Sequence, residues 1–266
     1  MTKDQLTSVF NKMQSKDLLV TIVMPARNEE KNIASAIDDT LSAFRDFGLR
    51  GEIVVVDDGS TDPTSLLVKR RMEENPGLIR MINHSNSQGI GASFRDGVKE
   101  ARGDIVCMLP ADNENYPKEI LRYVKLLDHV DIIIPFVINK NVRLKWRVFL
   151  SFMYRGIINS TFQTSFNYTN GTVLYRKSLL NEVDNIRRGF FYQTDILIRL
   201  VKRGYLFAEV PYRLRERKQG RSKAITLSAL REVVGGYLRL VKDIYFKRKT
   251  KGFASDSLSA KRCKIL

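Results

Sequence analysis

The stretch IVVVDDGSTDP, residues 53–63, contains the features that decide the fold of this chain. Four apolar β-branched residues in a row are typical of a short strand that is buried on both faces, as in a parallel sheet. Two aspartates follow at once, and the remaining residues are types that favour a turn and the start of a helix. The stretch therefore indicates a buried strand, a polar loop and a helix start.

Outward from this stretch, short apolar runs alternate with segments of helical spacing. This alternation predicts an α/β fold with an open, mostly parallel sheet, helices on both faces and right-handed crossovers. The expected strands are Leu18–Met24, Ile53–Val56, Leu78–Ile82, Ile105–Leu109 and Ile132–Pro135, and the expected helices are 29–47, 63–74, 91–101 and 117–127.

The pattern changes character near residue 140. Two amphipathic helix candidates bearing basic residues cover 142–162 and 225–246, and strands over 170–175 and 206–211 flank a helix over 192–202. The polar end of the chain has no periodic apolar pattern, so we expect it to be disordered.

Length and composition limit the class of protein. The chain has 266 residues, of which 43% are hydrophobic, enough for one sizeable core. Cys107 and Cys263 are too few for a disulfide framework or a four-ligand zinc site, which favours a reducing, cytosolic setting. His84 and His129 are too isolated for a histidine metal cluster, and we expect both to be ordinary loop or surface histidines. The N-terminus does not resemble a signal peptide, and no apolar run approaches the ~18 to 20 residues of a spanning helix.

The charge of the chain points to an anionic partner. The formal net charge is +16, and residues 211–251 carry thirteen Lys or Arg against three acids. The candidates are a phosphorylated substrate, an anionic lipid surface or nucleic acid. Nucleic acid is the least favoured, because aromatic residues would be interleaved with the basic patch. The helix within this segment has the composition of a membrane-surface helix, but a helix that packs on the domain and turns a basic face to solvent fits equally.

Polar side chains follow three of the expected strands. PARNEE (25–30) follows the first, the aspartates of 53–63 follow the second, and PADNENYP (110–117) follows the fourth. The carboxyl ends of parallel strands meet at one edge of the sheet, where such folds bind ligands. Carboxylates and an arginine there suit a nucleotide diphosphate and a divalent cation. The alternative is that these acids only form polar turns and cap the next helices.

Other nucleotide-site motifs are absent or incomplete. The segment QGIGASF (88–94) has two glycines of a dinucleotide fingerprint, but Phe94 stands where the third should be, and the segment follows the third expected strand. This argues against hydride transfer. The chain has no Gly-Lys-Ser/Thr phosphate loop.

Several motifs together resemble those of family 2 glycosyltransferases, which have the GT-A fold. They are VMPARNEE (23–30), IVVVDDGSTD (53–62), NSQGIGA (86–92) with Gly97, and ARGDIV (101–106). Two later segments, GYLFAEVPY (204–212) and RKQGRSK (217–223), are similar to the branch that contains dolichyl-phosphate mannose synthases and bacterial polyprenyl-phosphate glycosyltransferases. The resemblance extends over about residues 19–225.

The resemblance implies roles for particular residues and a divalent cofactor, Mg²⁺ or Mn²⁺. It places Pro25, Arg27 and Glu29 beside the nucleoside, Asp57 on the base or ribose with Asp58 also at the nucleotide sugar, Asp112 on the metal and diphosphate, and Arg217 over the donor from a mobile loop.

Two departures from the family pattern concern the metal and the acceptor. The family's Asp-x-Asp aligns with Pro110-Ala111-Asp112, so one carboxylate remains, and Glu114 could supply a second metal ligand. The Gly-Ser-Arg motif that the branch places after the fifth strand is also missing. Its electrostatic substitutes could be Lys140, Arg143, Lys145 or Arg147.

The expected function is metal-dependent transfer, with inversion, of a sugar from a nucleotide diphosphate to a polyprenyl phosphate at the membrane surface. The expected location is the cytoplasmic face of the membrane, with peripheral attachment. In an alternative, the acceptor is a saccharide hydroxyl and Asp195 is the general base, although Asp195 could equally be an acid that favours a helix N-terminus. A catalytically silent partner subunit or a basic binding module are further alternatives.

The expected organisation follows from these assignments. A GT-A domain covers residues 1–223, with a nucleotide-sugar-binding half (18–140) and an acceptor half (141–223), and is followed by a basic amphipathic helix (224–250) and a disordered tail (251–266).

Overall fold

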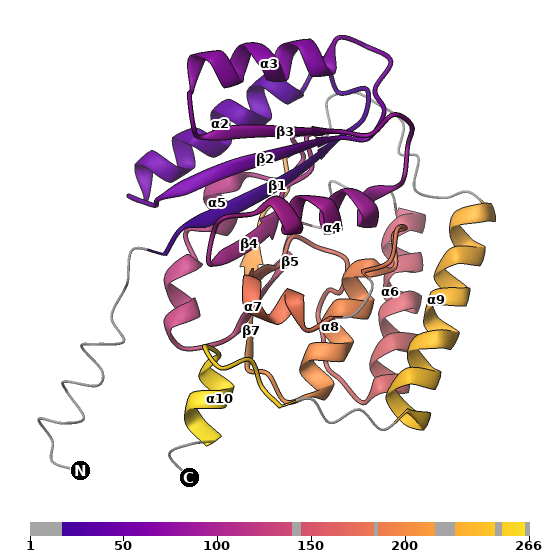
Figure 1. Cartoon of the computed structure of the whole chain (residues 1–266). Coiled ribbons are helices and arrows are strands. Elements are labelled where there is room, and N and C mark those ends of the chain that lie inside the picture. Colours follow the sequence, from indigo (N-terminus) through magenta and orange to yellow (C-terminus); the bar gives the residue numbers. More distant parts are fainter. Residues whose placement is uncertain (1–17, 140–144, 184–185, 216–226, 248–251, 264–266) are drawn as a thin grey trace, which may run out of the picture.

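The computed structural model describes residues 18–139, 145–183, 186–215, 227–247 and 252–263. These residues form a seven-stranded sheet with helices on both faces (Figure 1). The order of the strands across the sheet is β3-β2-β1-β4-β6-β5-β7. All strand pairs are parallel except those of β6, which is antiparallel to both β4 and β5. The predicted fold class, a mostly parallel sheet flanked by helices, is confirmed.

The first half of the chain alternates strands and helices as expected. The predicted helix over 117–127 is divided into a short α-helix and a 3₁₀ helix. The elements are β1 (Val20–Ala26), α2 (Ile33–Asp46), β2 (Gly51–Asp57), α3 (Thr64–Glu74), β3 (Ile79–Asn83), α4 (Ile90–Glu100), β4 (Ile105–Met108), α5 (Pro117–Leu121), η1 (Val124–Asp128) and β5 (Ile132–Val137).

The second half of the chain supplies the last two strands and most of the helices on one face of the sheet. Its elements are α6 (Lys145–Phe162), β6 (Leu174–Arg176), α7 (Lys177–Asn181), α8 (Tyr192–Lys202), β7 (Phe207–Tyr212), α9 (Leu227–Phe246) and α10 (Leu258–Cys263). Strand β6 has only three residues and lies between β4 and β5. The alternating pattern of strands and helices cannot show this insertion, because it depends on where the chain returns in space.

Two apolar layers enclose the sheet. Successive side chains of a strand point to opposite faces, so Ile22 and Met24 pack on the side of α2 and α5, and Val23 packs on the side of α4, α8 and α9. Both faces are covered, and for this reason the central strands have no polar alternation.

The C-terminal segment is ordered where we expected a disordered tail. Leu258 is buried at the start of α10, and the buried carboxylate of Asp131 accepts hydrogen bonds from the backbone N–H groups of Leu258 (2.6 Å) and Ser259 (3.2 Å). A buried carboxylate requires such donors, because its desolvation is otherwise uncompensated. The sequence pattern misses this segment because α10 is only six residues long and its partner lies more than a hundred residues earlier.

The register of the parallel strands brings the loops of interest to one edge of the sheet. Ala26 of β1 pairs with Asp57 of β2, and Asp57 pairs with Asn83 of β3. The loops after β1, β2 and β3 therefore leave the sheet side by side.

Candidate functional site

The loops that follow β1 and β2 are joined by hydrogen bonds between side chains and backbone. The Ser60 hydroxyl oxygen accepts from the backbone N–H of Asn28 (3.0 Å), and the Asn28 side-chain oxygen accepts from the N–H of Thr61 (2.8 Å). The backbone N–H of Glu29 donates to the Thr64 hydroxyl (2.8 Å). The two motifs that carry most of the family resemblance thus form one local structure.

Asp57 holds the turn after β2. Its side chain is buried, with one oxygen accepting from the backbone N–H of Ser60 (2.9 Å) and the other from the Ser65 hydroxyl. Within this turn, Gly59 has a φ of 73°, and a Cβ there would lie 2.9 Å from the backbone of Asn86. Only glycine permits this close approach, which brings the β3 loop against the β2 loop.

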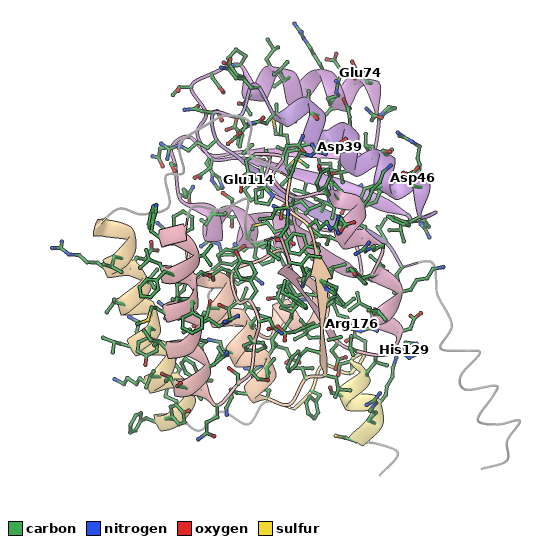
Figure 2. The ribbon with its side chains drawn as sticks, turned by 180° about the vertical axis from the view of Figure 1, so that it is seen from behind. Asp39, Asp46, Glu74, Glu114, His129 and Arg176 are labelled. Atoms are coloured by element: carbon green, nitrogen blue, oxygen red, sulfur yellow. The ribbon has the colours of Figure 1, made fainter. Side chains whose placement is uncertain are left out.

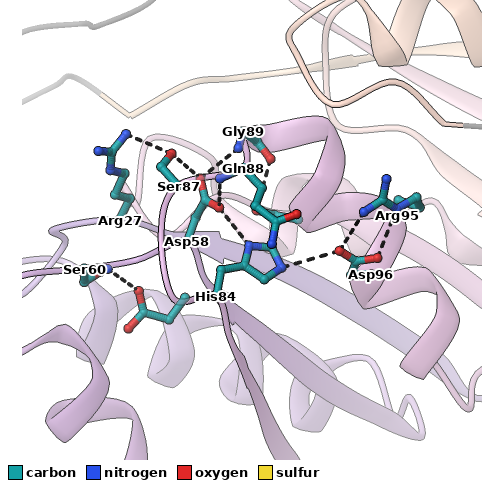
Figure 3. Close-up of polar contacts among 11 residues, drawn as sticks. Arg27, Asp58, Ser60, His84, Ser87, Gln88, Gly89, Arg95 and Asp96 are labelled. Carbon is teal, nitrogen blue, oxygen red and sulfur yellow. Dashed lines mark hydrogen bonds and ion pairs between the residues drawn. The ribbon is translucent and has the colours of Figure 1, made fainter.

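Asp58 is the centre of a hydrogen-bond network that gathers the β3 loop (Figure 3). One carboxylate oxygen accepts from His84 Nδ1 (2.8 Å) and Gln88 N (2.7 Å), and the other from Ser87 Oγ (2.7 Å) and Gly89 N (3.0 Å). A carboxylate has about four lone-pair positions, and all four are used. Burial opposes the charge, but these hydrogen bonds from His84, Gln88, Ser87 and Gly89 hold the pKa of Asp58 below its ordinary value.

His84 is a component of this site that the sequence interpretation missed. Its ring is almost fully buried, with Nδ1 on Asp58 and Nε2 3.4 Å from a carboxylate oxygen of Asp96, which is paired with Arg95 (Figure 3). The signal available in the sequence is its place directly after β3, next to the strand that ends in the two aspartates.

Arg27 presents a cation at the same edge. It is exposed, and its guanidinium donates to the Ser87 hydroxyl (2.9 Å), which in turn donates to Asp58 (Figure 3). On the other side, the backbone oxygen of Pro25 accepts from the N–H of Ala111 (3.0 Å), which ties the β4 loop to the end of β1. Arg27, Pro25 and the β4 loop are therefore parts of one sheet edge.

Asp112 and Glu114 lie in the β4 loop, beside the chain segment that follows β7. A side-chain oxygen of Asp112 accepts from the backbone N–H of Glu114 (3.2 Å), and the backbone oxygen of Glu114 accepts from the N–H of Arg215 (2.9 Å). The Arg215 guanidinium also donates a hydrogen bond to Asp39 of α2 (2.8 Å). Figure 2 shows Glu114 and Asp39 in the upper part of the molecule, away from His129. Arg217 lies outside the described residues, which end two positions earlier at Arg215.

The carboxylate oxygens at this edge of the sheet suit a metal ion that also binds oxygen atoms of a substrate. Within the described ranges, no group of three or more His, Cys, Asp or Glu side chains is placed to hold a metal ion. Asp112 and Glu114 are hard oxygen donors from one short loop, and Mg²⁺ is commonly held by one or two carboxylates together with substrate phosphates.

Asp195 is buried and ion-paired. Its side chain is 2% exposed, and its oxygens lie 3.0 Å from Arg199 Nε and 3.6 Å from Arg187 Nε. Asp195 lines a cavity beside α8. None of the residues predicted to bind the nucleotide sugar lines this cavity. Among the suggested substitutes for the missing Gly-Ser-Arg motif, Lys140 and Arg143 lie outside the described residues, and Lys145 and Arg147 are in the first turn of α6.

A large apolar surface covers α6 and α9, which lie side by side (Figure 1). The two helices are joined by a hydrogen bond between the Thr161 and Tyr237 hydroxyls (2.8 Å) and by stacking of Phe162 on Tyr245. No helix in the described part of the chain is long and apolar enough to cross a membrane. We define the apolar face as the exposed residues Trp146, Phe149, Leu150, Phe152, Met153 and Ile157 of α6 and Leu230, Val234, Leu238, Tyr245 and Phe246 of α9.

Comparison with protein families matches residues 21–184, more than half of the chain, to Glycosyl transferase family 2. The chain belongs to this family, as the sequence motifs indicated.

The curated relatives include enzymes that act on a lipid phosphate. The chain is 36% identical over 107 residues to undecaprenyl-phosphate 4-deoxy-4-formamido-L-arabinose transferase of Pseudomonas paraeruginosa, and 35% identical over 106 residues to the protein of that name of Pectobacterium carotovorum. Each match covers 40% of this chain and only 32% of the relative, so the chain matches about a third of the length of these proteins.

Solved structures share the fold. Glucosyl-3-phosphoglycerate synthase of Mycobacterium tuberculosis, in complex with Mn²⁺, UDP and glucosyl-3-phosphoglycerate, superimposes with a TM-score of 0.68 and 18% identity. The superposition covers 87% of this chain and 82% of that one. A structure of the same enzyme with Mg²⁺ and UDP gives a TM-score of 0.67 and 17% identity, over 88% of this chain and 83% of that one. These likenesses confirm the predicted GT-A fold.

Proposed function

We propose that this protein transfers a sugar, with inversion, from a nucleotide diphosphate to a polyprenyl phosphate at the cytoplasmic surface of a membrane. The observation that carries the proposal is the gathering of the loops after β1, β2, β3 and β4, and the segment after β7, at one edge of the sheet. Polar residues of three of the motifs responsible for the family resemblance, those within 23–30, 53–62 and 86–92, lie in these loops.

The donor nucleotide has its binding groups on the first three loops. Arg27 is an exposed cation held in place by Ser87, and Asp58 anchors Ser87 and the rest of the β3 loop. Asp58 uses its oxygens within the protein, so its contribution to the donor is to position neighbouring groups. Pro25, Glu29 and Asp57 form the adjacent part of the site.

The leaving diphosphate belongs at the β4 loop. Asp112 and Glu114 would hold Mg²⁺ or Mn²⁺ there jointly with the diphosphate oxygens, and the metal would supply charge neutralisation. The superimposed structures are complexes with Mn²⁺ or Mg²⁺ and UDP, which supports this assignment. The family resemblance assigns Arg217, two positions after Arg215 in the sequence, to the charge of the departing diphosphate.

A polyprenyl phosphate acceptor removes the need for a general base. Its attacking oxygen is already anionic, whereas a saccharide hydroxyl would have to lose a proton to a carboxylate within hydrogen-bond reach. The carboxylate of Asp195 is buried and engaged with Arg199 and Arg187, an arrangement that suits a structural ion pair better than a base. The names of the curated relatives, which specify undecaprenyl phosphate, favour the same acceptor class.

The apolar face supplies the contact with the membrane. Phe149 and Leu238 are 62% and 60% exposed, which is costly in water and favourable in the interfacial region of a bilayer. Exposed Arg231 and Arg239 lie on α9 beside the apolar face. Anionic lipid complements these cations and the net charge of +16.

A thermal-shift panel tests the donor assignment. UDP- and GDP-sugars are compared with and without Mn²⁺, because a ligand that binds only the folded state raises the melting temperature. We expect a manganese-enhanced shift with one nucleotide class, reduced in Asp112→Ala and retained in Asp38→Ala, which removes an exposed carboxylate of α2. Equal shifts for Asp112→Ala and the parent protein would refute the metal assignment.

A transfer assay tests the acceptor. The nucleotide sugar identified in the panel is incubated with polyprenyl phosphate in detergent, and the glycolipid is separated by chromatography. We expect a product with the inverted anomeric configuration, and Asp195→Asn should not abolish it if the folded state is preserved. Transfer to saccharide hydroxyls alone, lost in Asp195→Asn, would contradict the proposed acceptor.

A further inference from the structure

A strongly charged cavity lies beside α8 and α9, and its lining reaches the loop after β3 through Arg188. Helices α8 and α9 and residues 186–191 line an open cavity of about 1080 Å³, which we call the α8–α9 cavity. Its lining contains nine Arg or Lys side chains and three Asp or Glu side chains, and none of the predicted donor residues. A concave surface with such an excess of positive charge attracts anions.

Two of the three acids of the cavity are ion-paired. Asp195 pairs with Arg199, and Asp243 accepts from the same guanidinium at 2.7 Å. The Glu232 carboxylate lies against Gly189, where an added Cβ would come within 2.0 Å of it. Five of the nine cations are ion-paired: Arg187 and Arg199 with Asp195, Lys247 with Asp243, Arg95 with Asp96 and Arg203 with Glu182.

The other four cations of the lining are solvent-exposed and have no partner among the described residues. In the described part of the chain, the side chains of Arg188, Lys202, Arg231 and Arg239 form no ion pair or hydrogen bond with one another or with any other side chain or backbone group. Arg187 Nε makes no hydrogen bond but lies 3.6 Å from the Asp195 carboxylate. An anion in the cavity would offer acceptors to the four unpaired cations.

The walls of the cavity are set by close backbone approaches. The backbone oxygen of Arg188 accepts from the N–H of Gly91 (2.7 Å), and a Cβ at Gly91 would lie 1.9 Å from the backbone oxygen of Arg187. On the other side, a Cβ at Gly236 would lie 2.6 Å from the Phe191 ring. The backbone that carries Arg187 and Arg188 is thus held between α4 and α9.

We propose that the α8–α9 cavity is a binding site for an anion with several phosphate oxygens. Arginine guanidinium groups bind phosphate in a bidentate manner, and arginine predominates among the cations here. Both a lipid headgroup and a soluble oligophosphate have this chemistry. The headgroup is favoured because the next face of α9 exposes Leu230, Val234 and Leu238. The inference goes beyond the proposed function, because it requires neither the nucleotide sugar nor the transfer step.

The test for a soluble anion uses tripolyphosphate and the full chain, without nucleotide or divalent cation and at fixed ionic strength. Calorimetry should show binding that weakens on the order of tenfold in Arg239→Gln, the scale of a charge-assisted hydrogen bond. The matched control is Lys242→Gln, which removes an exposed cation of α9 that does not line the cavity. A second pair of variants leaves the lining arginines unchanged. Gly235 lines the cavity and has open space at Cβ, so a side chain there is accommodated. Gly235→Glu should weaken anion binding because it adds a negative charge, and Gly235→Ala should not.

The test for a lipid headgroup uses vesicles of phosphatidylcholine with and without phosphatidylglycerol. Selective loss of phosphatidylglycerol-dependent binding in Arg239→Gln and Gly235→Glu identifies a headgroup, and loss of tripolyphosphate binding alone identifies a soluble phosphate. Equal losses in the cavity variants and Lys242→Gln would mean that only diffuse charge acts, and would overturn the proposal. The nucleotide-induced thermal shift should persist in the cavity variants. Its loss there would overturn the separateness of the site, whereas its absence from the parent protein would count only against the proposed donor.

Discussion

Replacement of Asp58 by asparagine tests whether this residue holds the donor edge together. The Asp58 side chain is 8% exposed and accepts four hydrogen bonds. Asparagine keeps one acceptor oxygen for two of the donors, but its NH₂ group must face the other two. The Ser87 hydroxyl can rotate to accept, whereas the Gly89 backbone N–H cannot.

The magnitude follows from these contacts. An unsatisfied buried donor costs about 1–3 kcal/mol, and loss of the charge weakens the remaining bonds, so we expect about 2–4 kcal/mol of destabilisation. The assay is urea unfolding at pH 7, followed by circular dichroism. The control is Asp38→Asn, since Asp38 is 52% exposed and its single ion pair with Arg71 is worth about 0–1 kcal/mol. If the two variants were equally stable, the proposed bracing role of Asp58 would be wrong.

Three further predictions concern acid sensitivity, the C-terminal segment and the apolar face. The pKa of Asp58 is lowered in the folded state, so its contribution to stability is present above the unfolded value near pH 4 and is lost as the pH falls through the folded value. The stability difference between the parent and Asp58→Asn should accordingly shrink when unfolding is measured at decreasing pH below about 4, and a constant difference would argue against this linkage. Asp131→Ala should destabilise the fold by about 2–4 kcal/mol and make residues 252–263 sensitive to limited proteolysis, because buried N–H groups of α10 lose their acceptor, whereas Asp256→Ala at an exposed position should do neither. Phe149→Glu or Leu238→Glu should reduce vesicle binding about tenfold or more with little effect on unfolding, since each removes a large apolar side chain from the bilayer contact. Leu66→Glu, at a 52% exposed position of α3, is the control, and similar binding by all three variants would contradict the assigned membrane face.

The strand ends show why part of the site was predictable. Buried parallel strands are apolar throughout, so the polar residues that follow them mark the edge of the sheet directly in the sequence. This places Arg27, Asp57, Asp58 and Asp112 at one edge without knowledge of the contacts.

The contacts themselves were not predictable in the same way. His84 was expected to be an ordinary loop histidine, and it is instead buried between Asp58 and Asp96. The partners of Asp58 come from a loop about thirty residues later, and nothing in the local pattern specifies which donor meets which oxygen.

The apolar periodicity of α6 and α9 also left a choice that packing decides. The apolar face of an amphipathic helix can either pack against the domain or contact lipid. In the structure Leu240 and Ile158 take the buried positions, while Phe149 and Leu238 remain exposed. Only the arrangement of neighbouring helices determines how much of each apolar surface is covered.

The sequence by itself determined the alternating elements, the parallel core, the family and the edge of the sheet at which the polar loops meet. These properties follow from local periodicity and from short motifs. The tertiary structure decided the insertion of β6, the docking of α10 on Asp131, the exposure of the apolar face and the formation of the α8–α9 cavity. Each of these depends on residues that are far apart in the chain, and their free energy is set by which surfaces meet.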